Sequence, residues 1–275
     1  MANYTAADVK ALRDKSGAGM MDCKGALDEA DGDIEKAFEV LRLKGLKGVS
    51  KREGRTTTNG LVVARVAGGK GTLIELACET DFVAKAENFV ALAEEVADAV
   101  VASGASDVES ALAASHGGGT VADAITDKAA IMGEKVELRR VAVVEASGVD
   151  AYLHRTSRDL PPQVGVLLGY EGSDSDTAHD IAVHIAAFSP QYLTRDDVPA
   201  EVVAKEREIA EATARDEGKP EAALPKIVEG RVNGFFKETC LFDQDFAKDN
   251  KQSVGKVAEA AGLTLTGFVR FRVGV

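Results

Sequence analysis

A glycine-rich run around Lys70 is the first place where the sequence could bind a phosphate group. Residues 68–72 read GGKGT, and phosphate-binding loops combine glycines with one lysine in this way. In those loops a serine or threonine follows the lysine and a helix begins there, whereas Gly71 follows Lys70 and a β-rich run comes next. We therefore expect a hairpin turn at residues 68–72. The second glycine run, at residues 117–119, is expected to be a flexible connector.

Cysteine and histidine residues give no metal or redox pattern. Cys23, Cys78 and Cys240 are far apart and contain no C-x-x-C pair, so partly buried free thiols are the simplest interpretation. His179 and His184 are five residues apart, a spacing that does not place two ligands on one helical face. Motifs typical of hydrolases, metalloproteases and kinases are absent from the sequence. We predict no catalytic residue, no metal site and no cofactor.

The segment at residues 79–85, ETDFVAK, is unusual for a connection between a strand and a helix. It places the acid Asp81 beside the aromatic Phe82 at an element boundary. One interpretation is a helix cap followed by a phenylalanine of the core. The other is a projecting wedge that enters a pocket of a partner, because buried aromatic anchors dominate the energy of protein interfaces. The residues alone leave both interpretations open.

Charge and length restrict the class of protein. The 275 residues contain 33 Lys and Arg against 45 Asp and Glu, a net charge of −12. Such a chain repels phosphate backbones, so we expect no direct binding of nucleic acid. The first residues lack the pattern of a signal peptide and no apolar run is long enough to cross a membrane, so we expect a cytoplasmic protein without membrane contact. The length predicts two or three structural units.

The first 45 residues predict three short helices. Thr5 and Asp8 form a capping box before the first, which should end near residues 16–17, and Asp33 can cap the third, which Gly45 should end. Residues 42–55 then carry six Lys and Arg against a single acid. This composition favours a solvated linker, and a basic arm for nucleic acid is the weaker alternative.

The middle of the chain contains a faint internal repeat. Residues 60–78 and 149–170 each predict two strands, and helical periodicity follows each pair, at residues 88–103 and 176–187. Residues 136–146 predict one further strand. Two copies of a hairpin followed by a helix favour an α+β fold, in which each helix packs on one face of a small antiparallel sheet.

The last third predicts a helical hairpin and a final strand. Mixed charge and a narrow apolar seam follow Pro199, and a turn at residues 218–220 separates two helices. Core packing is the simplest explanation of the phenylalanines that follow, which are Phe235, Phe236, Phe242 and Phe246. Residues 263–273 alternate apolar with polar side chains and predict a strand.

Five segments resemble one family, bacterial elongation factor Ts. They occur in order along nearly the whole chain and are SGAGMMDCK (16–24), TDFVA (80–84), HIAAFSPQYL (184–193), GRVNGFFKE (230–238) and TGFVRFRVG (266–274).

The resemblance implies an α+β architecture with defined domains. These are a ubiquitin-associated-like (UBA-like) three-helix bundle at residues 1–45, a basic linker at 46–58, an N-subdomain at 59–140, a C-subdomain at 141–195 and 229–275, and a protruding helical hairpin inserted at 196–228. The two subdomains are expected to carry small antiparallel sheets. The hairpin is the element through which the family resemblance suggests a homodimer or a two-to-two complex.

The resemblance also implies a function without enzymatic chemistry. The family catalyses release of GDP from the GTPase elongation factor Tu during translation. The exchange wedge would be Thr80, Asp81, Phe82 and Val83, acting beside the bound magnesium ion. The GTPase contacts would be Leu12, Arg13, Met20, Met21, Lys24, Met132, Gly133 and His154. The loop after His154 departs from the family pattern, since Arg155 stands where the family has glycine.

Two other classes of function remain open from the sequence. An adaptor could bind partners through the N-terminal bundle alone. A nucleotide-binding enzyme could use the loop at residues 68–72, in which case the isolated chain would bind a nucleotide directly.

Overall fold

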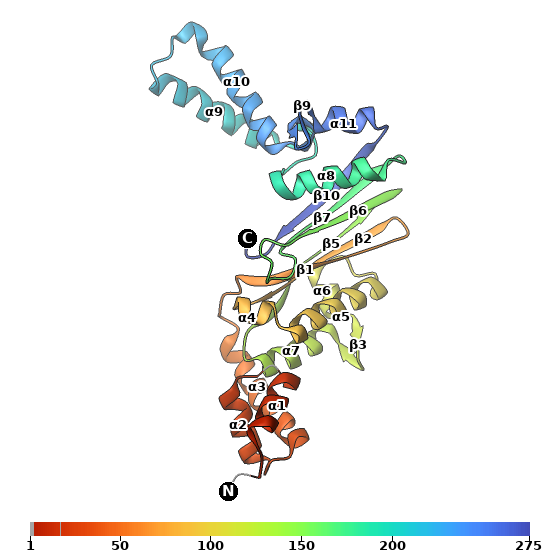
Figure 1. The fold of residues 1–275 in the computed structure, drawn as a ribbon. Helices are drawn as coiled ribbons and strands as arrows, with labels where there is room; N and C mark the ends of the chain where they lie inside the picture. The colour runs from red at the N-terminus through yellow and green to blue at the C-terminus, as the bar shows by residue number, and fades with distance from the viewer. Residues whose placement is uncertain (1–2, 17) are drawn as a thin grey trace. The chain divides into compact units, whose positions relative to one another are not determined.

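Helices and small antiparallel sheets share the chain, which confirms the predicted α+β class. The structure is a computed structural model that describes residues 3–16 and 18–275 (Figure 1). The chain divides into two compact units. Unit 1 comprises residues 1–143, 153–165 and 271–275, and unit 2 comprises residues 144–152 and 166–270. Among the described residues no helix is long and apolar enough to cross a membrane.

Three helices begin unit 1, as predicted: α1 (Ala6–Ser16), α2 (Met20–Glu29) and α3 (Ile34–Arg52). The N-terminal caps of α1 and α3 are hydrogen bonds between residues two or three positions apart. The backbone amide of Thr5 donates to Asp8, and Asp33 accepts from the amides of Glu35 and Lys36. Residue 17, near which the first helix was expected to end, lies outside the described residues. Leu12, Cys23 and Leu27 are among the residues that form the core of this bundle.

The expected end of the third helix at Gly45 is wrong, because α3 continues to Arg52 through most of the predicted linker. Gly45 lies where α3 packs on α7 (Val121–Met132). A Cβ at Gly45 would lie 2.0 Å from the carbonyl oxygen of Ala130, a distance that no side chain tolerates. The glycine therefore permits a close helix crossing and does not end the helix. An ion pair of 2.7 Å between Arg42 and Asp127 supports the same crossing.

A three-stranded sheet and the helices packed with it form most of the rest of unit 1. Strands β1 (Asn59–Ala67) and β2 (Lys70–Cys78) pair antiparallel, and β5 (Val136–Glu145) lies beside β2. Residues 68 and 69, both with positive φ, make the turn between β1 and β2, which confirms the predicted hairpin at the lysine-containing loop. Helices α5 (Glu87–Ser103), α6 (Val108–Leu112) and α7 contribute to the same core as the sheet.

The glycine run at residues 117–119 is more ordered than expected. Strands β3 (Ser115–His116) and β4 (Gly119–Thr120) pair across it. Gly117 and Gly118 have positive φ, as a tight turn requires. Thr120 then forms a capping box with Asp123 at the start of α7, so the run is a two-residue hairpin and not a free connector.

Unit 2 is built mostly from the second sheet and the helices on it. The strand order is β10 (Thr264–Arg272), β7 (Val164–Glu171), β6 (Gly148–His154). Helices α8 (Ser175–Phe188) and α11 (Val254–Ala260) and the ribbon of β8 (Asp245–Phe246) with β9 (Asp249–Ser253) pack into the same core. All of the predicted strands of this region are present.

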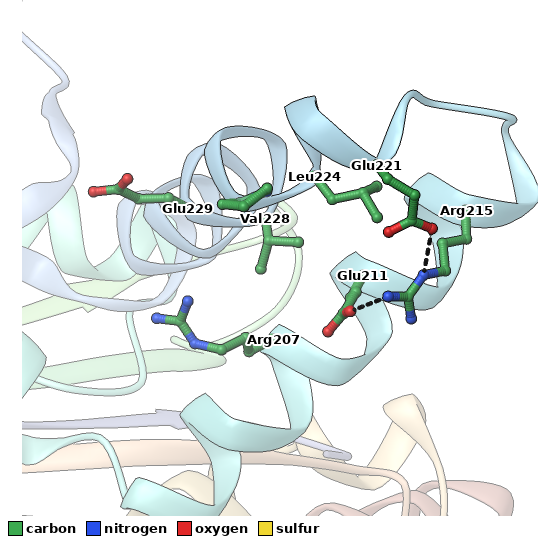
Figure 2. A pocket seen from close by; sticks show the side chains of 8 residues that line it. Arg207, Glu211, Arg215, Glu221, Leu224, Val228 and Glu229 are labelled. Carbon is green, nitrogen blue, oxygen red and sulfur yellow. Dashed lines mark hydrogen bonds and ion pairs between the residues drawn. The ribbon is translucent and has the colours of Figure 1, made fainter.

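The helical hairpin consists of α9 (Ala200–Asp216) and α10 (Leu224–Thr239). Its narrow apolar seam contains Ala210, Val228 and Val232. Figure 2 shows Arg215 bonded to Glu211 and Glu221 at the edge of a groove between the two helices. The return helix runs past residue 228 to Thr239, and of the phenylalanines that follow, Phe246 is buried in the core of unit 2.

Candidate protein-binding site

The segment between β2 and α5 forms a short helix, α4 (Asp81–Ala84), directly after the strand. Thr80 has extended backbone and its hydroxyl oxygen accepts from the amide of Val83 at 3.4 Å, which makes it the N-cap. Val83 packs on the core of unit 1 and Ala84 is fully buried. The predicted helix cap is therefore present, and the apolar residues that it sends to the core are Val83 and Ala84.

Phe82 points away from that core. Its exposed fraction is 74%, a high value for so large an apolar side chain. The ammonium group of Lys85 lies 4.6 Å from the ring centroid, and the same group pairs with Asp81 at 3.3 Å. The interpretation of Phe82 as a core residue is wrong, because the short helix turns the ring outward. An exposed aromatic residue on a capped turn is suited to binding a partner pocket.

A carboxylate from a distant part of the chain holds the base of this segment. One oxygen of Glu134 accepts from the backbone amides of Glu79 and Thr80 at 3.1 and 3.0 Å, and the other accepts from the Thr80 hydroxyl at 2.5 Å. In return, Glu79 accepts from the amide of Lys135 at 2.6 Å. The two segments are therefore latched together by four hydrogen bonds.

The thiol of Cys78 belongs to the same base. It donates to the carbonyl oxygen of Thr80 at 3.3 Å. Burial, with a smaller contribution from the negative charge of Glu134, raises the pKa of Cys78 to about 12. The group stays a neutral thiol at physiological pH, in agreement with the prediction of a buried free cysteine.

The turn that carries Glu134 also carries two of the predicted contact residues. Gly133 ends α7 in the left-handed conformation, with φ of 75°, and its amide donates to Ala129. Gly133 is exposed, whereas Met132 keeps only 9% of its surface. The latch through Glu134 places this turn next to the segment of Phe82.

A cleft of about 260 Å³ connects the turn with the N-terminal bundle. Its lining includes Met21 and Asp22 from α2, Arg52 from α3, and Met132 and Gly133. The structure therefore brings together predicted contact residues that are more than a hundred positions apart in the sequence.

The predicted contacts of the bundle differ in accessibility. Met20 and Met21 are exposed by 56% and 76%, and Arg13 and Lys24 are exposed as well. Leu12, by contrast, has no exposed surface and packs in the core of the bundle. A direct contact between Leu12 and a partner is not supported by this burial, which makes Leu12 part of the core that positions the exposed residues of the bundle.

His154 lies elsewhere. It is exposed at the end of β6, in the second sheet, and its carbonyl oxygen accepts from the amide of Gln163. The segment of Phe82 follows β2 of the first sheet. Glu79 begins the segment that the sequence singled out but was not assigned a role in the site. Glu134 was not predicted to take part, and no periodicity or motif in the sequence distinguishes it. In the part of the chain that the structure describes, no group of three or more His, Cys, Asp or Glu side chains could hold a metal ion.

Comparison with known proteins gives one consistent result. The family described as elongation factor TS matches residues 79–275. Elongation factor Ts of Micrococcus luteus is 64% identical over 277 residues, with both chains fully covered. The proteins of the same name from Clavibacter michiganensis subsp. michiganensis and Beutenbergia cavernae are 64% and 61% identical over 274 and 280 residues, again with full coverage of both chains. The matched region begins at Glu79, the first residue of the latch.

Proposed function

The chain belongs to the elongation factor Ts family of translation elongation factors, and on that premise we propose that it releases GDP from the GTPase elongation factor Tu. In this proposal the factor binds the GDP-bound GTPase, disturbs its magnesium and phosphate site, and leaves when GTP rebinds. It forms no covalent intermediate and acts only through binding. The proposed place of action is the cytoplasm, without direct contact to nucleic acid.

The exposed ring of Phe82 is the observation that carries this proposal. A phenylalanine that is 74% exposed on a capped and latched segment has no role in the fold of the chain. The cap and the latch fix the backbone that carries the ring, which lowers the entropy lost on binding. We propose that Thr80, Asp81, Phe82 and Val83 form the wedge, with Asp81 acting beside the magnesium ion.

Further contacts are needed on energetic grounds. If the partner binds GDP at nanomolar affinity, about 12 kcal/mol must be offset, whereas one interface hot spot contributes about 2 to 4 kcal/mol. The exposed residues of the bundle, Met20, Met21, Arg13 and Lys24, and the turn at Met132 and Gly133 are the proposed additional contacts. His154 is a separate proposed contact on the second sheet.

Coupling between nucleotide and factor follows from these contacts. A factor that binds the empty GTPase much better than the nucleotide-bound one lowers the affinity for nucleotide, and nucleotide lowers the affinity for the factor by the same ratio. Exchange therefore needs no catalytic side chain.

The test is release of fluorescent GDP from the cognate elongation factor Tu, followed by stopped flow with and without this protein. Acceleration by orders of magnitude at substoichiometric factor is the expected result. A folded sample that leaves the release rate unchanged would refute the proposal. The oligomeric proposal, a homodimer or a two-to-two complex formed through α9 and α10, is tested separately by sedimentation of the free factor and of the complex.

An adaptor that works through the bundle is the second candidate, because Met20 and Met21 are exposed at the start of α2. Replacing both by alanine would then abolish binding of every partner, while Phe82→Ala would change nothing. A nucleotide-binding enzyme is not supported, since residues 68–72 turn between two antiparallel strands and no helix begins there. Titration of the isolated chain with labelled GDP checks this point, and no binding is expected.

A further inference from the structure

We propose that Glu134 is a positioning residue of the exchange wedge, and that it acts by holding the backbone of Glu79 and Thr80 so that Phe82 projects from the surface. The inference rests on the proposed function for its effect on exchange, but its structural part can be measured without the partner. It extends the site to a residue that touches neither the proposed magnesium site nor the ring of Phe82.

The geometry at Glu134 is specific. Strand β2 ends at Cys78, so the next two amides, of Glu79 and Thr80, leave the sheet. Both donate to one carboxylate oxygen of Glu134, at 3.1 and 3.0 Å, and the Thr80 hydroxyl donates to the other at 2.5 Å. Hydrogen bonds to an ionised carboxylate are stronger than neutral ones. A single side chain therefore fixes the two residues that immediately precede α4.

The latch is reciprocal. Glu79 accepts from the amide of Lys135 at 2.6 Å, and Arg55 lies 3.2 Å from the Glu79 carboxylate. Glu79 and Thr80 are thus hydrogen-bonded to Glu134 and Lys135 in both directions. Because Gly133 and Met132 precede Glu134 directly, the latch also sets the position of the wedge relative to that turn.

The hydrogen bonds to Glu134 determine the direction in which Phe82 projects. The ring is 74% exposed, and the ammonium group of Lys85 lies over it at 4.6 Å from the centroid. The position of the ring therefore depends mainly on the backbone that carries it. If the amides of Glu79 and Thr80 are released, the capped turn gains freedom, and the wedge must be ordered again each time it enters the partner.

The test compares Glu134→Ala with Glu134→Gln and with the control Asp107→Ala. Glutamine keeps an oxygen for the two amides and an amide group that can donate to the Thr80 hydroxyl. The Glu134→Gln protein should therefore behave much more like the wild type than Glu134→Ala does. Asp107 likewise accepts a backbone amide, from Ser110 at 2.9 Å, at the cap of α6. If Glu134→Ala fails to fold, Glu134→Asp replaces it, because the shorter side chain cannot reach all three donors.

The first measurement is hydrogen exchange of the free protein, resolved at the amides of Glu79 and Thr80. Glu134→Ala should raise their exchange rates by about tenfold, the equivalent of one hydrogen bond to a charged group, whereas Asp107→Ala leaves them unchanged. Unchanged rates in Glu134→Ala would overturn the positioning role whatever the protein does to its partner.

The second measurement is GDP release at varied factor concentration. Glu134→Ala should lower the maximal rate by about tenfold while the half-saturating concentration stays nearly constant, since the surface contacts remain. In a Phe82→Ala background the same substitution should have almost no further effect, because both changes act through one ring. Equal effects in the two backgrounds would overturn the inference. A wild-type protein that does not accelerate release refutes the proposed function instead, and the amide exchange rates then decide alone on Glu134.

Discussion

Replacing Phe82 with alanine separates the role of the proposed wedge from the stability of the fold. The ring is 74% exposed, so its removal takes little apolar surface out of a core, and we expect the free energy of unfolding to change by less than about 0.5 kcal/mol. At the interface the same ring would be a hot spot of about 2 to 4 kcal/mol, which corresponds to about 30- to 1000-fold in the rate of GDP release.

The assay is stopped-flow release of fluorescent GDP from elongation factor Tu, accompanied by urea unfolding of the free factor. Two controls bracket the result. Val101→Ala removes an apolar side chain that is 42% exposed on α5, outside the proposed contacts, and should leave release unchanged. Phe89→Ala empties a fully buried position and should cost about 3 to 5 kcal/mol of stability. A Phe82→Ala protein that is stable and exchanges at the wild-type rate would refute the wedge.

Three further predictions concern the fold. Gly45→Ala should destabilise unit 1 by at least about 1 to 3 kcal/mol in urea unfolding, because its Cβ would clash with the carbonyl of Ala130, whereas Gly25→Ala meets open space and should be neutral or stabilising. Burial alone would raise the pKa of Glu137, but hydrogen bonds from neighbouring side chains outweigh it and lower the pKa to about 2. Its contribution to stability is therefore present above about pH 4.5 and lost as the pH falls through about 2, and Glu137→Gln should flatten the acid limb of a stability profile. Burial lowers the pKa of His184, so its contribution to stability is present above about pH 6.5 and falls as the pH decreases toward the lowered value. In thermal unfolding between about pH 7.5 and 5.5, a His184→Gln protein should therefore show a weaker dependence of stability on pH than the wild type.

Local signals explain what the sequence predicted well. The cap at Asp33 and the turn at Gly68 depend on neighbours within three residues, and the alternation of the last strand depends on its own side chains. For such features the sequence contains nearly all of the relevant interactions.

Contacts between distant residues explain what it did not predict. Gly45 does not end its helix; it is needed where α3 packs closely on the backbone of Ala130. Ala130 is 85 positions away, so no local pattern indicates this contact. The direction of Phe82 depends on which side of a four-residue helix meets the core, and the role of Glu134 depends on amides 54 and 55 positions away. Leu12 shows a limit of resemblance, since the resemblance assigns a contact by position in the sequence, whereas neighbouring residues of a helix point about 100° apart and Leu12 lies on the buried side of α1.

The uninterrupted course of α3 changes how the two proposed contact regions of unit 1 behave as binders. Had residues 46–58 been a flexible tether, the bundle and the wedge would have been two ligands joined by a linker, and the second contact would have formed at an effective concentration of only about millimolar. Instead, α3 continues to Arg52, packs on α7 and is paired with it through Arg42 and Asp127, which restricts the chain between the bundle and the wedge. Part of the freedom of the second contact is then already lost in the folded chain, so less entropy is lost when both contacts bind the same partner.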